Sequence, residues 1–261
     1  MFFAASGPLT MRADPAIYAC FVRPFLLLPC GGGERMDERR SDHPIRQGLY
    51  LEGGQPVPVA SDRLLHSILS VQKLLAEIRA CTVCAAYLPH GVRPVVAADP
   101  AAGVLIIGQA PGRRVHESGV PWHDPSGNRL REWLEVDEAT FYDPTKIALM
   151  PMGFCYPGTG KSGDLPPRPE CAPLWHDRLL AAMPNIQLTL LIGQYAQRCY
   201  LKDRTEKNLT ETVRNFSAYG SAVIPLPHPS PRNQIWLKRN PWFLSDLLPD
   251  LRSRMAPALS D

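Results

Sequence analysis

Four short apolar runs, each ending at glycine or proline or just beyond one, constrain the fold of this chain more than any other feature. They read GVLIIG at residues 103–108, IALMPM at 147–152, LTLLIG at 188–193 and AVIPLP at 222–227. Strands that are buried on both faces of a parallel sheet have such unbroken hydrophobicity. Helical stretches separate the runs, so the pattern predicts a three-layer α/β/α sandwich around a central, mainly parallel, four-stranded sheet.

Most of the chain is expected to form one domain. Its 261 residues, of which 45% are hydrophobic, suffice for a single sizeable core. We place the domain at residues 61–250, beginning with an amphipathic helix whose N-cap is Ser61. Residues 1–60 lack hydrophobic periodicity and are predicted to be a disordered N-terminal extension, with Met36 as an alternative start. Residues 251–261 are assigned to a C-terminal tail.

Composition excludes several classes of protein. No apolar run approaches the roughly 18 residues of a membrane span, so we expect no membrane contact. We also expect the protein to be a cytoplasmic monomer. The formal net charge of +3 permits a polyanionic partner without requiring one. The chain has seven cysteines, an odd number, and no convincing secretory signal, so a full set of disulfides is disfavoured. Ligation of a metal ion or a cluster by some of these cysteines is therefore to be considered.

Four of the cysteines have the arrangement of a ligand set. Cys81 and Cys84 form a C-x2-C pair, Cys155 follows the second apolar run, and Cys171 begins the next helical stretch. Two intervening residues bring both sulfurs of such a pair to one side of a turn, and two further thiolates complete a four-sulfur site. Spacing alone leaves structural zinc, a [4Fe–4S] cluster and unligated buried thiols open.

Two motifs lie at the ends of apolar runs. The first run leads into GQAPG at 108–112, a tight turn that exposes backbone N–H groups and suits an anion or a base. The fourth run leads into LPHPS, where prolines fix the backbone around His228 and Ser230 can cap the following helix. The carboxyl ends of parallel strands meet at one edge of a sheet, so we expect both motifs in one site.

A basic and aromatic segment follows the second motif. Arg232, Lys238 and Arg239 alternate there with Ile235 and Trp236. Such a segment suits a phosphate backbone with an apolar wedge beside it. An ordinary amphipathic helix with solvated basic residues is the alternative.

Together these residues resemble the uracil-DNA glycosylase superfamily, most closely its iron–sulfur branch, called family 4. The first motif of that branch reads GEAPG, continues to R-P-F, and ends in a glycine before a helix. This chain has GQAPG at 108–112, V-P-W at 120–122 and S-G at 126–127. The second motif matches as H-P-S at 228–230, and the four cysteines stand where the branch places its cluster ligands.

The resemblance implies a monofunctional DNA N-glycosylase, a hydrolase of base excision repair. Such an enzyme flips a deaminated base, here uracil, out of DNA and hydrolyses its N-glycosidic bond to leave an abasic site. By position, Trp122 would stack on the base and His228 would hydrogen-bond the uracil O2 as negative charge develops. The pocket would be lined by Gly108, Ala110, Pro111 and Gly112, with Gln109 helping to place the hydrolytic water.

The resemblance also assigns the DNA contacts and the cofactor. The segment from Ser230 to Trp236 would enter the minor groove, and basic side chains nearby would hold phosphates. The residues concerned are Ser230, Arg232, Asn233, Trp236, Lys238 and Arg239, with Arg113 and Arg114 as further phosphate ligands. Cys81, Cys84, Cys155 and Cys171 would hold a structural [4Fe–4S] cluster, with structural zinc as the alternative.

The first motif departs from the family at the residue that would activate water. Gln109 replaces the motif Glu, and Val115 and His116 replace the acidic pair that usually follows, with Glu117 one residue later. Glutamine can orient a water but cannot accept its proton. We therefore expect His116 to assist the water. One alternative is that Glu117 assists instead, and another is that the water attacks with little base catalysis.

A second departure concerns base selection. Pro151 stands where the family places the Asn that reads the uracil edge, so a backbone amide near Met152 or Gly153, or the Gln109 side chain, would have to serve instead. This leaves a shifted specificity toward hypoxanthine or xanthine, or a non-catalytic DNA-binding or damage-sensing relative, as alternative functions. Residues 156–170 contain no histidine, which disfavours covalent capture of the abasic site.

Overall fold

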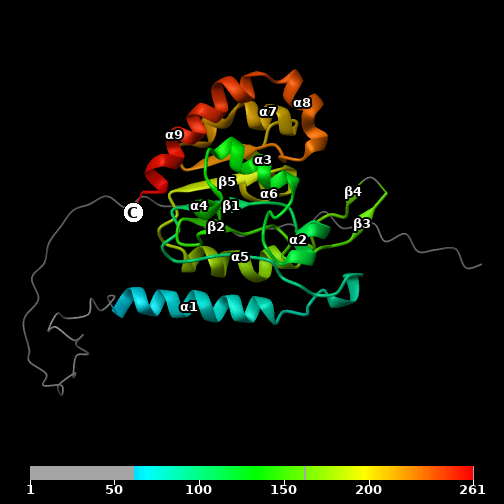
Figure 1. Cartoon of the computed structure of the whole chain (residues 1–261), viewed down its shortest axis with the longest axis vertical. Coiled ribbons are helices and arrows are strands. Elements are labelled where there is room, and N and C mark those ends of the chain that lie inside the picture. Colours follow the sequence, from blue (N-terminus) through cyan, green and yellow to red (C-terminus); the bar gives the residue numbers. More distant parts are fainter. Residues whose placement is uncertain (1–61, 162, 261) are drawn as a thin grey trace, which may run out of the picture.

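The computed structural model describes residues 62–161 and 163–260, so the predicted extension at 1–60 lies outside the described residues. Four strands form one sheet in the order β2-β1-β5-β6, and every neighbouring pair is parallel (Figure 1). The strands are β1 (Val104–Ile107), β2 (Ile147–Leu149), β5 (Leu188–Ile192) and β6 (Val223–Leu226). Each lies within one of the four apolar runs, which confirms the predicted sandwich.

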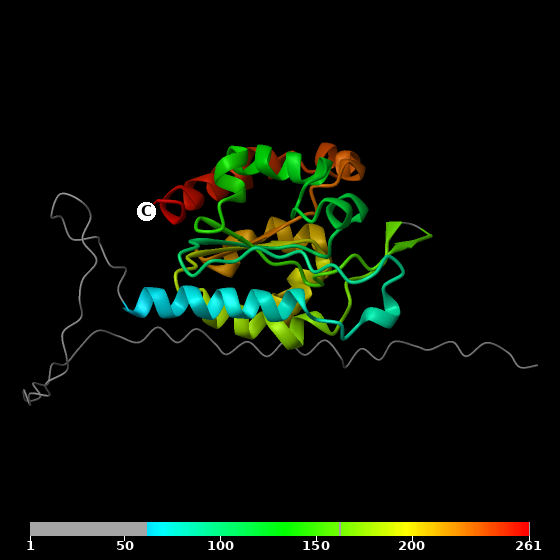
Figure 2. The same ribbon diagram turned by 60° about the horizontal axis from the view of Figure 1, so that its bottom comes forward.

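Helices cover both faces of this sheet, as Figure 2 shows. Leu105 and Ile107 of β1 belong to one hydrophobic core, whereas Val104 and Ile106 belong to the other. The first core is shared with α1 (Asp62–Arg79), α5 (Cys171–Ala182) and α6 (Gln194–Leu201). The second is shared with α3 (Pro125–Leu134), α4 (Glu138–Tyr142), α7 (Leu209–Arg214) and α9 (Leu248–Ala258).

The first helix is amphipathic, as its spacing predicts. Val71, Leu74, Leu75 and Ile78 of α1 are buried against the sheet side, while Leu69 is 68% exposed. At 18 residues α1 is the longest of the described helices, and none of these is long and apolar enough to cross a membrane.

Shorter elements surround the sheet. One is an antiparallel hairpin of β3 (Thr159–Gly160) and β4 (Gly163–Asp164), which extends to one side of the sheet in Figure 1. Strands of two residues carry no readable alternation, so the sequence did not predict this hairpin. The others are η2 (Ala85–Tyr87), α2 (Arg113–Ser118), η3 (Lys202–Arg204), η4 (Phe216–Tyr219), η5 (Pro231–Asn233), α8 (Gln234–Arg239) and the π-helical η6 (Phe243–Leu247).

The packed unit extends beyond residue 250, into the segment assigned to a tail. Leu251, Met255 and Ala258 of α9 are buried in the second core. The end of α9 also lies against the start of β1, because a Cβ added at Gly103 would overlap the carbonyl oxygen of Ala258. The C-terminal helix is therefore part of the outer layer.

We predict that Leu251→Ala lowers the free energy of unfolding by about 2–5 kcal/mol, because it leaves a cavity in a core where Leu251 is fully buried. Leu244→Ala is the control, since Leu244 is 52% exposed. Urea titrations followed by circular dichroism measure both changes. Equal small losses in the two variants would contradict the assignment of α9 to the core.

Candidate active site

A cavity of about 620 Å³ lies at the carboxyl ends of the strands. The loops that follow β1, β2 and β6 form its wall together with the β3–β4 hairpin. Ligands of open α/β sheets bind at this edge. The sequence-predicted site residues that line the cavity are Gly108, Gln109, Ala110, Pro111, Gly112, Arg113, Trp122, His228, Ser230 and Arg232.

Two glycines of the first motif make room for Trp122. A Cβ added at Gly108 would lie 2.8 Å from Cζ2 of the Trp122 indole. A Cβ at Gly127 would overlap the Trp122 carbonyl oxygen, and Trp122 itself has a positive φ of 57°. The indole is thus held over the start of the GQAPG loop. Its ring centroid lies 5.8 Å from that of His228, so the two predicted site rings face one cavity together.

The turn that carries His228 is fixed by side chains from other positions. Asn233 Nδ2 donates a hydrogen bond to the His228 carbonyl oxygen at 2.7 Å, and Arg129 Nη1 donates to the Ser230 carbonyl oxygen at 3.1 Å. Burial lowers the pKa of His228, and the nearby carboxylate of Asp124 opposes this shift. The imidazole is therefore neutral at pH 7 and can offer one N–H to a ligand.

Backbone hydrogen bonds join the loops after β1 and β2. Met152 N–H donates to the Gly108 carbonyl at 3.0 Å, and Gly153 N–H donates to the Gln109 carbonyl at 2.9 Å. These two amides were candidates for reading a base edge, but they are used within the protein, and neither residue lines the cavity. The Gln109 side chain does line it and packs against Gly193, where a Cβ would lie 2.7 Å from Nε2.

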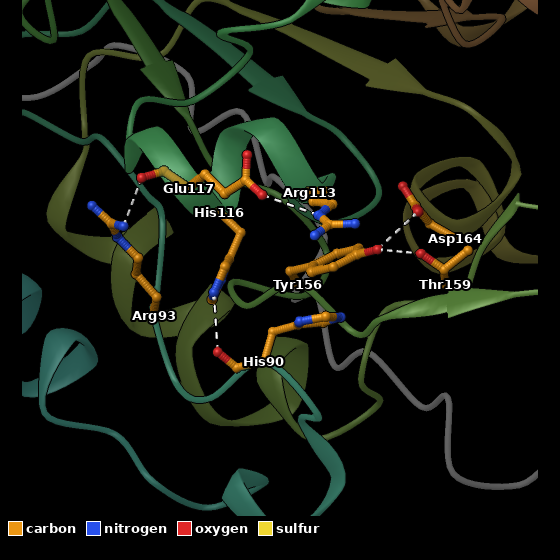
Figure 3. Close-up of polar contacts among 8 residues, drawn as sticks. All are labelled: His90, Arg93, Arg113, His116, Glu117, Tyr156, Thr159 and Asp164. Carbon is orange, nitrogen blue, oxygen red and sulfur yellow. Dashed lines mark hydrogen bonds and ion pairs between the residues drawn. The ribbon is translucent and has the colours of Figure 1, made fainter.

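The two groups expected to activate water lie outside the cavity lining. Figure 3 shows His116 turned from α2 toward His90, whose carbonyl oxygen lies 3.2 Å from His116 Nε2. The carboxylate of Glu117 is paired with Arg113 at 3.0 Å, and both side chains are well exposed. The His116 ring instead lies beside that of Tyr156, with the two centroids 5.8 Å apart.

Two carboxylates that the sequence reasoning missed line the cavity instead. Asp124 caps α3, accepting a hydrogen bond from Gly127 N–H at 2.8 Å. Asp164 comes from the hairpin and accepts a hydrogen bond from the Tyr156 hydroxyl at 3.4 Å (Figure 3). The D-P-S-G sequence at 124–127 is a readable helix start, whereas nothing in the sequence indicates the position of Asp164.

The segment predicted to contact DNA divides into an inward and an outward part. Trp236 donates from Nε1 to Thr210 Oγ1 at 2.8 Å and packs edge-on against Trp242. Ile235 is instead the outward apolar side chain, with 64% of its surface exposed. The exposed cations of this segment are Arg232, Lys238 and Arg239.

The four cysteines come together from three segments of the chain. Cys84, Cys155 and Cys171 are buried, and Cys81 is half-buried. Burial raises the pKa of Cys155 to about 11 and that of Cys171 to about 12, and both feel the charges of Cys81 and Cys84 as well. Cys84 and Cys155 also pack together in one small cluster of buried residues. The described side chains nevertheless place no three potential ligands in metal-binding geometry.

A buried histidine supports Pro151, which lines the cavity. His176 Nε2 lies 3.1 Å from the Pro151 carbonyl oxygen, and Nδ1 lies 2.6 Å from the Tyr200 hydroxyl. The carbonyl can only accept, so Nε2 carries the proton and Nδ1 accepts from the tyrosine. The His176 ring also stacks on Phe154 at 5.7 Å. Burial lowers the pKa of His176 to about 4, so the ring is neutral.

The family described as the Uracil DNA glycosylase superfamily matches residues 96–252. This range contains the four-stranded sheet and all but one of the residues that line the cavity, Val95. It includes Cys155 and Cys171 but begins after Cys81 and Cys84.

We predict that His176 makes the folded state sensitive to acid. The His176 ring takes up a proton near pH 6.5 in the unfolded chain but only near pH 4 in the folded chain. The contribution of the neutral, buried ring to the free energy of unfolding is therefore complete above pH 6.5 and is lost as the pH falls toward 4. Relative to His176→Gln, the wild-type free energy of unfolding should fall by about 3 kcal/mol over that interval. Parallel denaturation profiles for the two proteins would contradict this.

Proposed function

Because the chain belongs to the uracil-DNA glycosylase superfamily, we propose that it excises uracil from DNA by hydrolysing the N-glycosidic bond. The observation that carries this proposal is the pairing of the Trp122 and His228 rings, 5.8 Å apart, in one cavity at the strand ends. No described residue lining this cavity is a lysine. That favours a monofunctional hydrolase, since no amine is at hand to form a Schiff base.

Trp122 is proposed to receive the flipped base. Its indole is pinned between the start of the GQAPG loop and the backbone near Gly127, so little ordering remains to be done when a base stacks on it. Stacking of a base on an aromatic side chain contributes about 1–3 kcal/mol. This gain helps to offset the cost of extracting the nucleotide from the duplex.

His228 is proposed to stabilise the departing base. As the C1′–N bond breaks, negative charge gathers on the base, and a neutral imidazole can donate one hydrogen bond to the oxygen that carries it. The anchoring of this turn by Asn233 and Arg129 means that the donor needs no rearrangement during the reaction. A preorganised donor of this kind is worth about 3–4 kcal/mol.

The exposed segment after His228 is proposed to hold the DNA. Arg232, Lys238 and Arg239 supply positive charge for phosphates. Ile235, rather than Trp236, is the side chain placed to fill the gap that a flipped nucleotide leaves, because it is exposed while Trp236 packs inward.

The four neighbouring thiols are proposed to hold a [4Fe–4S] cluster. The donor set fits such a group in kind, since four cysteine thiols are the ligands that a four-iron cluster takes, and each would give up its proton on binding. When bound, the cluster would form one Fe–S bond to each of the four cysteines and would take no redox part in the hydrolysis. Its role would be to join the chain after α1, the loop after β2 and the start of α5. Structural zinc on the same residues is the alternative.

We predict that the purified protein converts uracil in single- and double-stranded oligonucleotides to alkali-labile abasic sites. His228→Ala should lower the single-turnover rate about 100-fold or more, because a preorganised donor is lost. His123→Ala is the matched control, since His123 is exposed and lies outside the cavity lining.

Substrates containing hypoxanthine and xanthine test base selection in the same assay, because Pro151 has no amide to read a base edge. Excision of these bases alone would move the substrate from uracil to a deaminated purine. No cleavage of any of the substrates would refute the proposal and favour a non-catalytic DNA-binding relative.

We predict that anaerobically purified protein is brown, absorbs broadly near 400 nm and contains about four iron atoms per chain, as for a single four-iron cluster. Cys84→Ser should lose most of this absorbance. Val83→Ala is the control, because Val83 lies within the same C-x2-C pair and is 61% exposed. Colourless protein that releases zinc to a chelator would identify zinc instead.

A further inference from the structure

The cavity contains an acid that can replace the one missing from the first motif. Gln109 cannot accept a proton, and the cavity lining includes neither His116 nor Glu117. Two carboxylates do line it, Asp124 and Asp164. A water-activating role for either carboxylate rests on the proposed glycosylase function.

The Asp124 carboxylate has one oxygen engaged and one directed at the cavity wall. Its Oδ1 accepts the capping hydrogen bond from Gly127 N–H at 2.8 Å, which fixes the side chain at the start of α3. Its Oδ2 lies 3.9 Å from the position of a Cβ at Gly112, the last residue of the GQAPG loop. A half-buried carboxylate is thus presented on a rigid helix end beside the loop.

Asp124 also lies close to the proposed leaving-group donor. Its charge acts on His228, opposing the effect of burial on the pKa of that ring. Asp124 is only two residues after Trp122, and the Trp122 carbonyl accepts a hydrogen bond from Asp124 N–H at 2.9 Å. The carboxylate therefore shares one corner of the cavity with both rings.

Asp164 is the weaker candidate. Its Oδ2 lies 3.4 Å from the same Cβ position at Gly112, so the two carboxylates flank this loop. However, Asp164 is exposed, sits on a hairpin of two-residue strands, and directs Oδ1 to the Tyr156 hydroxyl. A catalytic base needs a fixed position relative to the reacting atoms, and Asp124 has the firmer support.

We propose that Asp124 is the general base of the hydrolysis. A water beside Oδ2 attacks C1′ of the flipped nucleotide, so a C–O bond forms as the C1′–N bond breaks. The electron pair of the broken bond leaves with the base, and His228 stabilises the resulting charge. The water proton passes to the Asp124 carboxylate and from there to solvent, while the departed base takes a proton from solvent.

The test compares Asp124→Asn with wild-type protein in single-turnover excision of uracil. Asparagine is also a good N-cap residue, so this variant keeps the cap of α3 and removes only the charge and basicity. We expect the rate constant to fall about 100-fold or more, as for loss of a general base. Affinity for uracil-containing DNA should hold or rise, because a negative charge near a polyanion is removed.

Two further variants complete the set. Asp124→Ser also keeps a capping oxygen for α3, but its shorter side chain cannot reach as far toward the GQAPG loop. It should lose activity to a similar degree, and similar losses in two variants that both keep the cap would show that the loss does not come from a folding defect in the first variant. Asp137→Asn is the matched control expected to retain the wild-type rate, since Asp137 caps α4 as Asp124 caps α3 but is exposed and outside the cavity lining. Thermal unfolding checks that all the variants are folded.

The outcomes separate this inference from the function on which it rests. Active wild-type protein with Asp124→Asn near the wild-type rate would overturn the role of Asp124 alone, and loss of rate in Asp164→Asn instead would transfer that role to the hairpin. Wild-type protein inactive on every substrate would remove the glycosylase function and the general base with it.

Discussion

Burial of β1 on both faces is the constraint from which the rest of the structure follows. Its four residues are fully buried, and its backbone pairs in parallel with β2 on one side and β5 on the other. Val104 stands opposite both Ile147 and Leu188, so the neighbouring strands begin level with it. Parallel pairing in this register brings the loops that leave the strands to one edge, and that edge is where the cavity lies.

Close backbone approaches then make the cavity wall rigid. The Trp122 indole can lie over the first motif only because Gly108 has no side chain, and its backbone can approach α3 only because Gly127 has none. Hydrogen bonds from Met152 and Gly153 tie the next loop to the same motif. The cavity is therefore shaped by the fold before any ligand arrives, which is the condition for electrostatic preorganisation.

The cysteine cluster and the cavity share a segment of chain. Cys155 directly precedes Tyr156, which is fully buried, lines the cavity and bonds to Thr159 and Asp164 of the hairpin. A metal centre at Cys155 would fix this part of the wall through the backbone alone. A structural cofactor could in this way affect catalysis without contacting the substrate.

The sequence by itself determined the sheet, its layers and the edge that carries the site. Four short, continuously hydrophobic runs predict the strands, and their parallel pairing brings GQAPG and His228 to one edge, whereas the strand order β2-β1-β5-β6 comes from the tertiary structure. Only the tertiary structure decided which side chains face the cavity. In short turns and one-turn helices a rotation of one residue exchanges inside and outside, so Trp236 packs inward and Ile235 outward. The position of Asp164 depends on a hairpin held by contacts between side chains, and no local pattern encodes such contacts.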